Sequence, residues 1–150
     1  MKKTLFIGLL SLTAIFIAAP SFAQIRKIPG EVTDALKAKY PDASNVTWKD
    51  KITGFAADFD MNSTKYQARF SNKGEWQSTE TAISETDLPG NVKDGLSKSK
   101  YADWELKSIY TIDLPEDKVQ YRLQVAKSDL QKKNLLFSND GQLLRDNITL

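Results

Sequence analysis

The segment from Asp58 to Asn62 carries oxygen-bearing side chains at alternate positions, which is the spacing at which a calcium-binding loop begins. Asp58, Asp60 and Asn62 could supply the first three ligands of such a loop. The loop also needs a glycine at its sixth position and a bidentate glutamate at its twelfth, where this chain has Ser63 and Arg69. The segment therefore predicts the solvated face of a β-strand that enters a turn, and we expect no metal site.

Histidine and cysteine are both absent from the sequence. A Ser-His-Asp triad, a cysteine nucleophile and a zinc site with nitrogen or sulfur ligands therefore cannot be built. Carboxylates, lysines, tyrosines and serines remain, and no pair of them stands out by its spacing as an acid–base couple. We expect no catalytic residue, no cofactor and a function other than that of an enzyme.

Residues 1–23 have the three zones of a secretory signal peptide. Two lysines precede an uncharged, mostly apolar run that extends to Ala19, and a serine and an alanine occupy the −3 and −1 positions of a cleavage site that ends at Ala23. A retained membrane anchor is the alternative, but the run is shorter than the roughly 20 residues of a spanning helix. We expect cleavage before Gln24, a periplasmic or secreted protein, no stable membrane insertion after cleavage, and one working region at 24–150.

The predicted mature region has no net charge. The whole chain has 21 lysines and arginines against 19 aspartates and glutamates, and two of the lysines are the only charges before Gln24. Removal of the signal peptide therefore leaves 19 charges of each sign. Binding to nucleic acid needs a basic face that displaces counterions from phosphates. The charge balance does not favour a nucleic-acid partner.

Two motifs recur in the same order along the chain. Residues 28–36 match residues 88–96, with identical proline, glycine, valine, aspartate and leucine. The sequence Phe-Ser-Asn-Lys-Gly at 70–74 returns as Phe-Ser-Asn-Asp-Gly at 137–141. Such self-similarity indicates an internal repeat. The predicted repeat units are residues 28–84 and 88–146.

Each predicted unit begins with a helix. Val32, Ala35 and Leu36 recur at helical spacing after a proline, and Val92 and Leu96 repeat this stripe in the second unit. Apolar and polar residues then alternate with a period of two, which is typical of antiparallel strands with one buried face. The strands with this pattern are 55–61, 65–70, 104–114 and 119–125. We expect an α+β fold of two tandem units, each with one helix followed by about four antiparallel strands, the helix lying on one face of the sheet.

The chain resembles a known family in the same regions. The Ile-Pro of 28–29, the Tyr-Pro-Asp of 40–42, Trp48 and the segment from Phe70 to Trp76 are similar to PepSY-like, β-lactamase-inhibitor-like domains of bacterial envelope proteins. The resemblance implies a helix packed on a four-stranded antiparallel sheet, often in tandem. It also implies restraint of secreted enzymes, because PepSY domains occur in propeptides of thermolysin-type peptidases. The chain lacks the cysteines of the β-lactamase inhibitor, and the contact residues of that inhibitor have no counterparts that can be placed on this sequence, so β-lactamase is not predicted as the target.

The period of two also predicts a binding face. If the apolar residues of 55–61 and 65–70 face the helix, the polar residues between them share the opposite face. Trp76 shares the polar face if its alternation with Ser78 and Glu80 continues, and the exposure of Trp76 and of Trp48 stays open. The predicted partner-binding residues are Asp58, Asp60, Gln67, Arg69 and Trp76.

Two functions are compatible with these features. The first is a binding protein that contacts or inhibits another envelope or secreted protein, such as a peptidase, through its polar sheet face. The alternative is a periplasmic carrier of a small ligand, such as a lipid, a glycan or a peptide, which needs an apolar cavity. Whole strand faces lined with polar residues favour the first.

Overall fold

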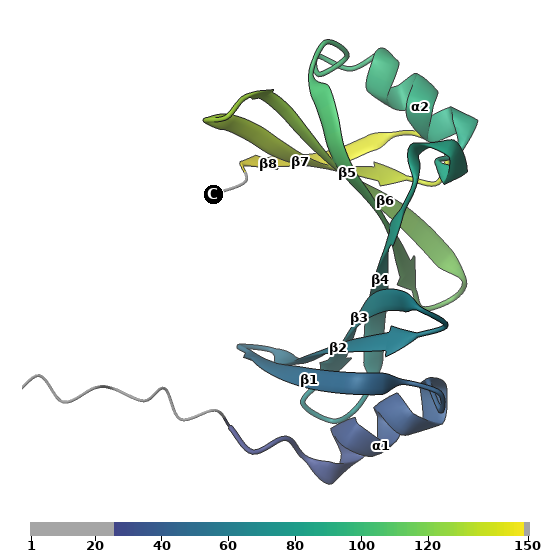
Figure 1. Ribbon diagram of the computed structural model, residues 1–150, viewed down its shortest axis with the longest axis vertical. Helices are drawn as coiled ribbons and strands as arrows, with labels where there is room; N and C mark the ends of the chain where they lie inside the picture. Colours follow the sequence, from purple (N-terminus) through teal and green to yellow (C-terminus); the bar gives the residue numbers. More distant parts are fainter. Residues whose placement is uncertain (1–25, 149–150) are drawn as a thin grey trace, which may run out of the picture.

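The computed structural model describes residues 26–148, and the predicted signal peptide lies outside them. The helices are α1 (Gly30–Lys39) and α2 (Gly90–Ser97), with a short 3-10 helix η1 (Glu85–Asp87) before α2. The strands are β1 (Ser44–Lys51), β2 (Gly54–Met61), β3 (Thr64–Ser71), β4 (Trp76–Ile83), β5 (Glu105–Leu114), β6 (Lys118–Ser128), β7 (Gln131–Ser138) and β8 (Leu143–Ile148). Each strand pairs antiparallel with the next, in the order β1 to β8 (Figure 1).

The sheet continues without a break through the middle of the chain. β4 pairs with β5 from Thr79 opposite Asp113 to Ile83 opposite Ile109, so all eight strands belong to one sheet. The predicted α+β fold of two tandem units, each with its own four-stranded sheet, is therefore wrong. An unpaired strand edge leaves its backbone N–H and C=O groups without partners, and the pairing of β4 with β5 removes two such edges at once.

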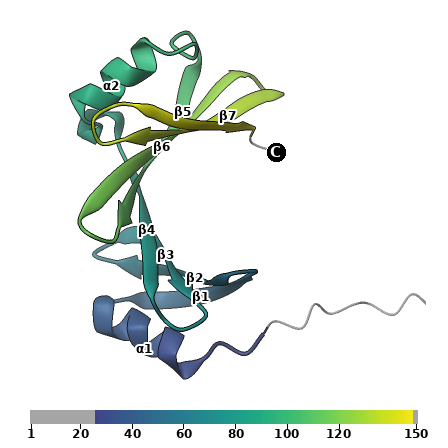
Figure 2. The ribbon, with the colours of Figure 1, turned by 180° about the vertical axis from the view of Figure 1, so that it is seen from behind.

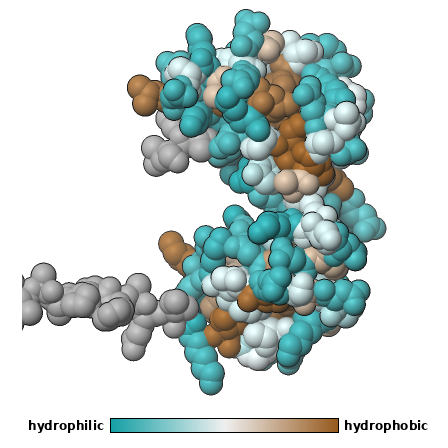
Figure 3. Space-filling model, viewed as in Figure 1, coloured by the Kyte–Doolittle hydropathy of each residue, from teal (hydrophilic) through white to brown (hydrophobic). Residues whose placement is uncertain are grey.

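The sheet curves strongly, so that its two faces differ in shape. Both helices lie on the outer side of the curve, α1 at one end and α2 at the other, and the other face of the sheet borders an opening (Figures 1 and 2). We call these the helix-covered face and the concave face. Figure 3 shows mostly hydrophilic residues along the arms that border the opening.

The two helices follow the predicted apolar stripes, and both are short. α1 starts after Pro29, buries Val32 and Leu36, and ends at Lys39, where the N–H of the next residue, Tyr40, donates to the carbonyl of Leu36. α2 buries Val92 and ends at Ser97. Glycine within a helix lowers its stability, but a Cβ at position 95 would lie 2.1 Å from the carbonyl oxygen of Gly141, so this glycine lets α2 touch the turn after β7.

Two hydrophobic clusters lie between the helices and the sheet. Under α1, Val32 and Leu36 pack against Phe55, Phe59 and Phe70. The second cluster, under α2, includes Val92, Tyr101, Leu123, Leu135 and Phe137. The predicted apolar residues of strands 55–61, 65–70 and 119–125 therefore face the helices, which confirms the period-two prediction for these strands.

The recurring Phe-Ser-Asn-x-Gly motif forms the turn after β3 and the turn after β7. Its glycines, Gly74 and Gly141, have φ angles of +81° and +85°, which side chains rarely tolerate. A Cβ on Gly74 would also lie 2.6 Å from the carbonyl oxygen of Glu31, and a Cβ on Gly141 would collide with that of Asn91. In both places the glycine lets a turn of the sheet touch the first turn of a helix.

Candidate binding face

Four of the five predicted partner-binding residues lie together on the concave face. Asp58 of β2 stands opposite Gln67 of β3, and Arg69 lies two residues further along β3. The Gln67 side-chain amide donates to an oxygen of Asp58 over 2.6 Å, and Asp58 also forms an ion pair with Lys49 of β1. Asp60 accepts a hydrogen bond of 2.9 Å from the side chain of Asn45. The polar groups of this face therefore hold one another in place.

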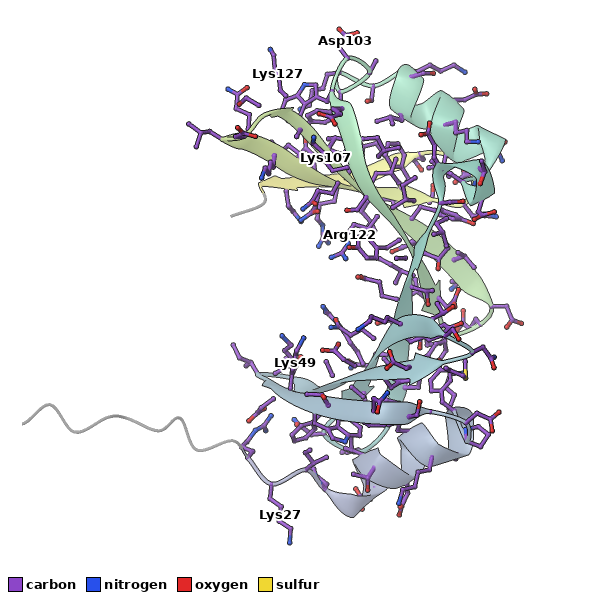
Figure 4. All side chains as sticks on the ribbon, in the orientation of Figure 1. Lys27, Lys49, Asp103, Lys107, Arg122 and Lys127 are labelled. Atoms are coloured by element: carbon purple, nitrogen blue, oxygen red, sulfur yellow. The ribbon has the colours of Figure 1, made fainter. Side chains whose placement is uncertain are left out.

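Electrostatics keep Asp58 ionised at low pH. Burial by itself raises the pKa of this carboxyl, but the hydrogen bonds with Lys49 and Gln67 outweigh burial, so that the pKa lies below its usual value. A carboxylate with two side-chain donors has a fixed orientation as well as a fixed charge. The concave face therefore presents a defined negative group beside Lys49 (Figure 4).

Trp76 does not belong to this group. Ser78 pairs with Arg69, but Trp76 pairs with Phe70, so Gln77 is an extra residue that forms a β-bulge. The bulge turns Trp76 to the helix-covered face, where it packs against the cluster under α1. Its ring nitrogen donates to the hydroxyl of Thr79 over 2.8 Å. The assignment of Trp76 to the polar face is therefore wrong, because strict alternation takes no account of a bulge.

The other undecided tryptophan also points to the helix-covered face. Trp48 of β1 is half-buried, and its ring centroid lies 6.2 Å from that of Phe70. The ammonium of Lys39 lies 3.7 Å from the ring centroid of Trp76, on the same side of the sheet. Both tryptophans therefore belong to the packing between α1 and the sheet.

Sequence reasoning missed the centre of the concave face. Arg122 of β6 forms an ion pair with Glu80 of β4, and its guanidinium carbon lies 4.5 Å from the ring centroid of Tyr110 on β5. Burial raises the pKa of Glu80, and the charges of Arg122 and Arg69 offset only part of this effect. These three residues come from both predicted repeat units, and only the pairing of β4 with β5 brings them together. Arg122 alternates with Tyr121 and Leu123 in the sequence, and this was the available signal.

The concave face is hollowed next to this group. A depression of about 580 Å³ is lined by side chains of β1 to β5. Its polar lining includes Asp58, Asp60, Lys65, Gln67 and Glu80, and Tyr110 contributes an aromatic side chain. Figure 4 shows Arg122 and Lys49 on the two arms that border the opening. The face can therefore receive a convex surface that offers charged and hydrogen-bonding groups.

Two further observations concern residues 26–148 alone. No helix within this range is long and apolar enough to cross a membrane. No group of three or more Asp and Glu side chains within it is arranged to hold a metal ion.

The comparison with protein families identifies the chain. Residues 53–145 match the family described as "Putative beta-lactamase-inhibitor-like, PepSY-like". This match spans more than half of the chain, and the protein belongs to this family. The predicted resemblance is thereby confirmed. No curated protein matches the chain.

Solved structures from Bacteroides species have a similar fold. A "putative periplasmic protein" of Bacteroides eggerthii is 27% identical with a TM-score of 0.74, over 81% of this chain and 89% of that one. A BLIP-like protein of Bacteroides fragilis is 26% identical with a TM-score of 0.69, over 82% of this chain and 87% of that one. The match with each extends over nearly the whole folded region.

Proposed function

We propose that this protein is a non-enzymatic binding protein of the bacterial envelope, which contacts another exported protein through its concave face. Membership of a β-lactamase-inhibitor-like family supports a role in protein binding. The observation that carries the proposal is the group of Glu80, Tyr110 and Arg122, a polar and aromatic centre on an uncovered sheet face. Arginine and tyrosine are enriched among the residues that dominate protein interfaces.

The proposed contact area extends from this centre towards β1. Glu80, Tyr110 and Arg122 form its middle, and Asp58, Asp60, Gln67 and Arg69 form its continuation on β2 and β3. Hydrogen bonds and ion pairs already order most of these side chains, so binding loses little side-chain entropy. An envelope or secreted enzyme such as a peptidase is the proposed kind of partner, and blocking of its substrate cleft is the proposed effect.

The proposed location is the periplasm or the outside of the cell. Residues 1–23 support export, and one similar structure carries the name of a periplasmic protein. The intact mass of the exported protein should correspond to a chain that starts at Gln24. Recovery of the full-length chain from membranes would contradict this location.

The test begins with the isolation of the partner. Immobilised mature protein captures it from an envelope extract, and its affinity is then measured with both proteins purified. The double variant Glu80→Gln/Arg122→Gln removes both charges of the central ion pair together, and Lys93→Ala on exposed α2 is the control. We expect the double variant to raise Kd by about tenfold or more and the control to leave it unchanged. An equal Kd for all three proteins would overturn the proposal.

The carrier alternative has its own structural candidate. A groove of about 320 Å³ lies between α1 and β1, and its lining includes Leu36, Val46 and Trp48 beside the polar Thr33 and Lys37. Native mass spectrometry of protein purified from the periplasm separates the two functions. A small molecule that stays bound, without any captured protein, would favour the carrier.

A further inference from the structure

The ends of two hairpins carry fully exposed aliphatic side chains. Ile52, between β1 and β2, is 98% exposed, and Leu130, between β6 and β7, is 97% exposed. Turns between strands normally consist of polar residues, glycine and proline, and the other hairpin turns of the described chain follow this rule, for example Asn62-Ser63 and Glu116-Asp117. We call Ile52 and Leu130 the tip residues.

Both tips project from the same side of the molecule. In the two opposite views of Figures 1 and 2, the β1–β2 hairpin and the β6–β7 hairpin end on the side of the opening, away from α1 and α2. Figure 3 shows hydrophobic residues that stand out at the ends of both arms on this side. One broad surface could therefore touch both hairpins at the same time.

Lysines accompany the aliphatic tips. The segments 49–54 and 127–133 contain five lysines and two aspartates. One of these aspartates, Asp50, is already paired with Arg26, whose Nε donates to both of its oxygens over 2.9 and 3.0 Å. The two segments together therefore have a net charge of +3, although Lys49 is itself paired with Asp58 on the concave face.

We propose that the two tips bind an anionic lipid surface. An aliphatic side chain gains free energy when it leaves water for the headgroup and acyl boundary, and lysines near an anionic leaflet add electrostatic attraction. A protein pocket would need a shaped apolar patch around each tip, whereas each tip here has one aliphatic side chain among flexible lysines. A fluid anionic surface matches this arrangement, and it needs no shape complementarity.

Contact at two separate points would also fix the orientation of the protein. The opening of the concave face would then face the bilayer, so that a protein held there would lie at the membrane surface. The lipid contact does not rest on the proposed protein-binding function, because it uses different residues and has its own ligand.

Vesicle flotation tests this proposal with the mature chain, residues 24–150. The vesicles contain either phosphatidylglycerol and phosphatidylcholine in equal amounts or phosphatidylcholine alone. We expect binding to the anionic vesicles only, release by high salt, and about a tenfold loss of partitioning for the double variant Ile52→Ser/Leu130→Ser. The control Asn62→Ser/Asn139→Ser changes two polar turn residues elsewhere and should bind as the unaltered protein does.

Three results would overturn the proposal. The first is absence of binding to the anionic vesicles, and the second is equal binding by the double variant and the unaltered protein. The third is a double variant that still binds vesicles and no longer binds a captured protein partner, which would place the tips in a protein interface. The thermal melt of the double variant Ile52→Ser/Leu130→Ser should match that of the unaltered protein, because the tip side chains are almost fully exposed.

Discussion

The two faces of the sheet differ in how they hold their side chains in place. On the helix-covered face, Val32, Val92, Phe70 and Phe137 are almost completely buried, and packing fixes their positions. On the concave face, ion pairs and hydrogen bonds do so, as between Glu80 and Arg122. Burial of apolar area stabilises a fold strongly, whereas partly exposed ion pairs contribute little. We therefore assign stability to the helix-covered face, and recognition by the concave face is our proposal.

Phe59 and Asp60 provide the sharpest test of this difference, because they are neighbours on β2 that point to opposite faces. Phe59 is 2% exposed and stacks against Tyr66 with ring centroids 5.5 Å apart. Phe59→Ala should lower the free energy of unfolding by roughly 3 to 4 kcal/mol, because it leaves a cavity. Asp60→Ala should change it by less than about 0.5 kcal/mol. Urea unfolding of both variants measures the two free energies of unfolding. Similar losses in the two variants would contradict the assignment of stability to the helix-covered face.

Trp76 tests the position of the bulge in β4. On the helix-covered face its ring packs against the cluster under α1 and donates to Thr79, so Trp76→Ala should lower the free energy of unfolding by roughly 2 to 3 kcal/mol. Gln77→Ala, at the neighbouring bulge residue, is the control and should cost much less. If Trp76→Ala unfolds at the same denaturant concentration as the unaltered protein, Trp76 does not pack on this face.

Gly141 tests the contact between the turn after β7 and the first turn of α2. Gly141→Ala would place a methyl group against the carbonyl of Asn91 at a positive φ, and should destabilise the protein by roughly 2 kcal/mol. Gly30→Ala is the matched control, because a Cβ there meets nothing within 4 Å and alanine favours the helix. Thermal melts should show a lower Tm for the first variant and an equal or higher Tm for the second. A tolerated alanine at 141 would mean that the turn does not touch α2.

The smallest expected effect is a pH dependence on the concave face. Because burial holds the pKa of Glu80 above 4.5, the folded protein binds this proton more tightly than the unfolded chain does. Its contribution to stability is therefore full below pH 4.5 and is lost as the pH rises through the folded-state pKa. Unfolding at a series of pH values should show this loss in the unaltered protein and not in Glu80→Gln. The same slope in both proteins would contradict the burial of Glu80.

The sequence predicted which side chains lie on each face of most strands, because apolar and polar residues alternate there without interruption. Asp58, Asp60, Gln67 and Arg69 lie on one face as expected, since β2 and β3 pair in a constant register. Trp76 was misplaced because a bulge adds one residue, and alternation cannot show where a bulge lies. Local patterns thus predict the faces of a strand up to its first irregularity.

The same patterns could not predict that the eight strands form one continuous sheet. Two repeated motifs predicted two helix-plus-sheet units and left open whether their sheets join, because pairing between β4 and β5 depends on contacts distant in sequence. The group of Glu80, Tyr110 and Arg122 depends on this pairing, so it could not be assembled from the sequence. The repeated motifs themselves have a local cause, since Gly74 and Gly141 each meet the start of a helix.

Nuclear magnetic resonance of the labelled mature protein, titrated with its purified partner, tests most directly that recognition uses the concave face. Two side-chain signals report on this face without a mutation. One is the Nε–H of Arg122, which has no hydrogen-bond partner among the described residues. The other is the side-chain amide of Gln67, which donates to Asp58. We predict that these signals shift on binding, while the indole signal of Trp76 on the other face stays in place. A shift of the Trp76 signal with unchanged Arg122 and Gln67 signals would contradict the account.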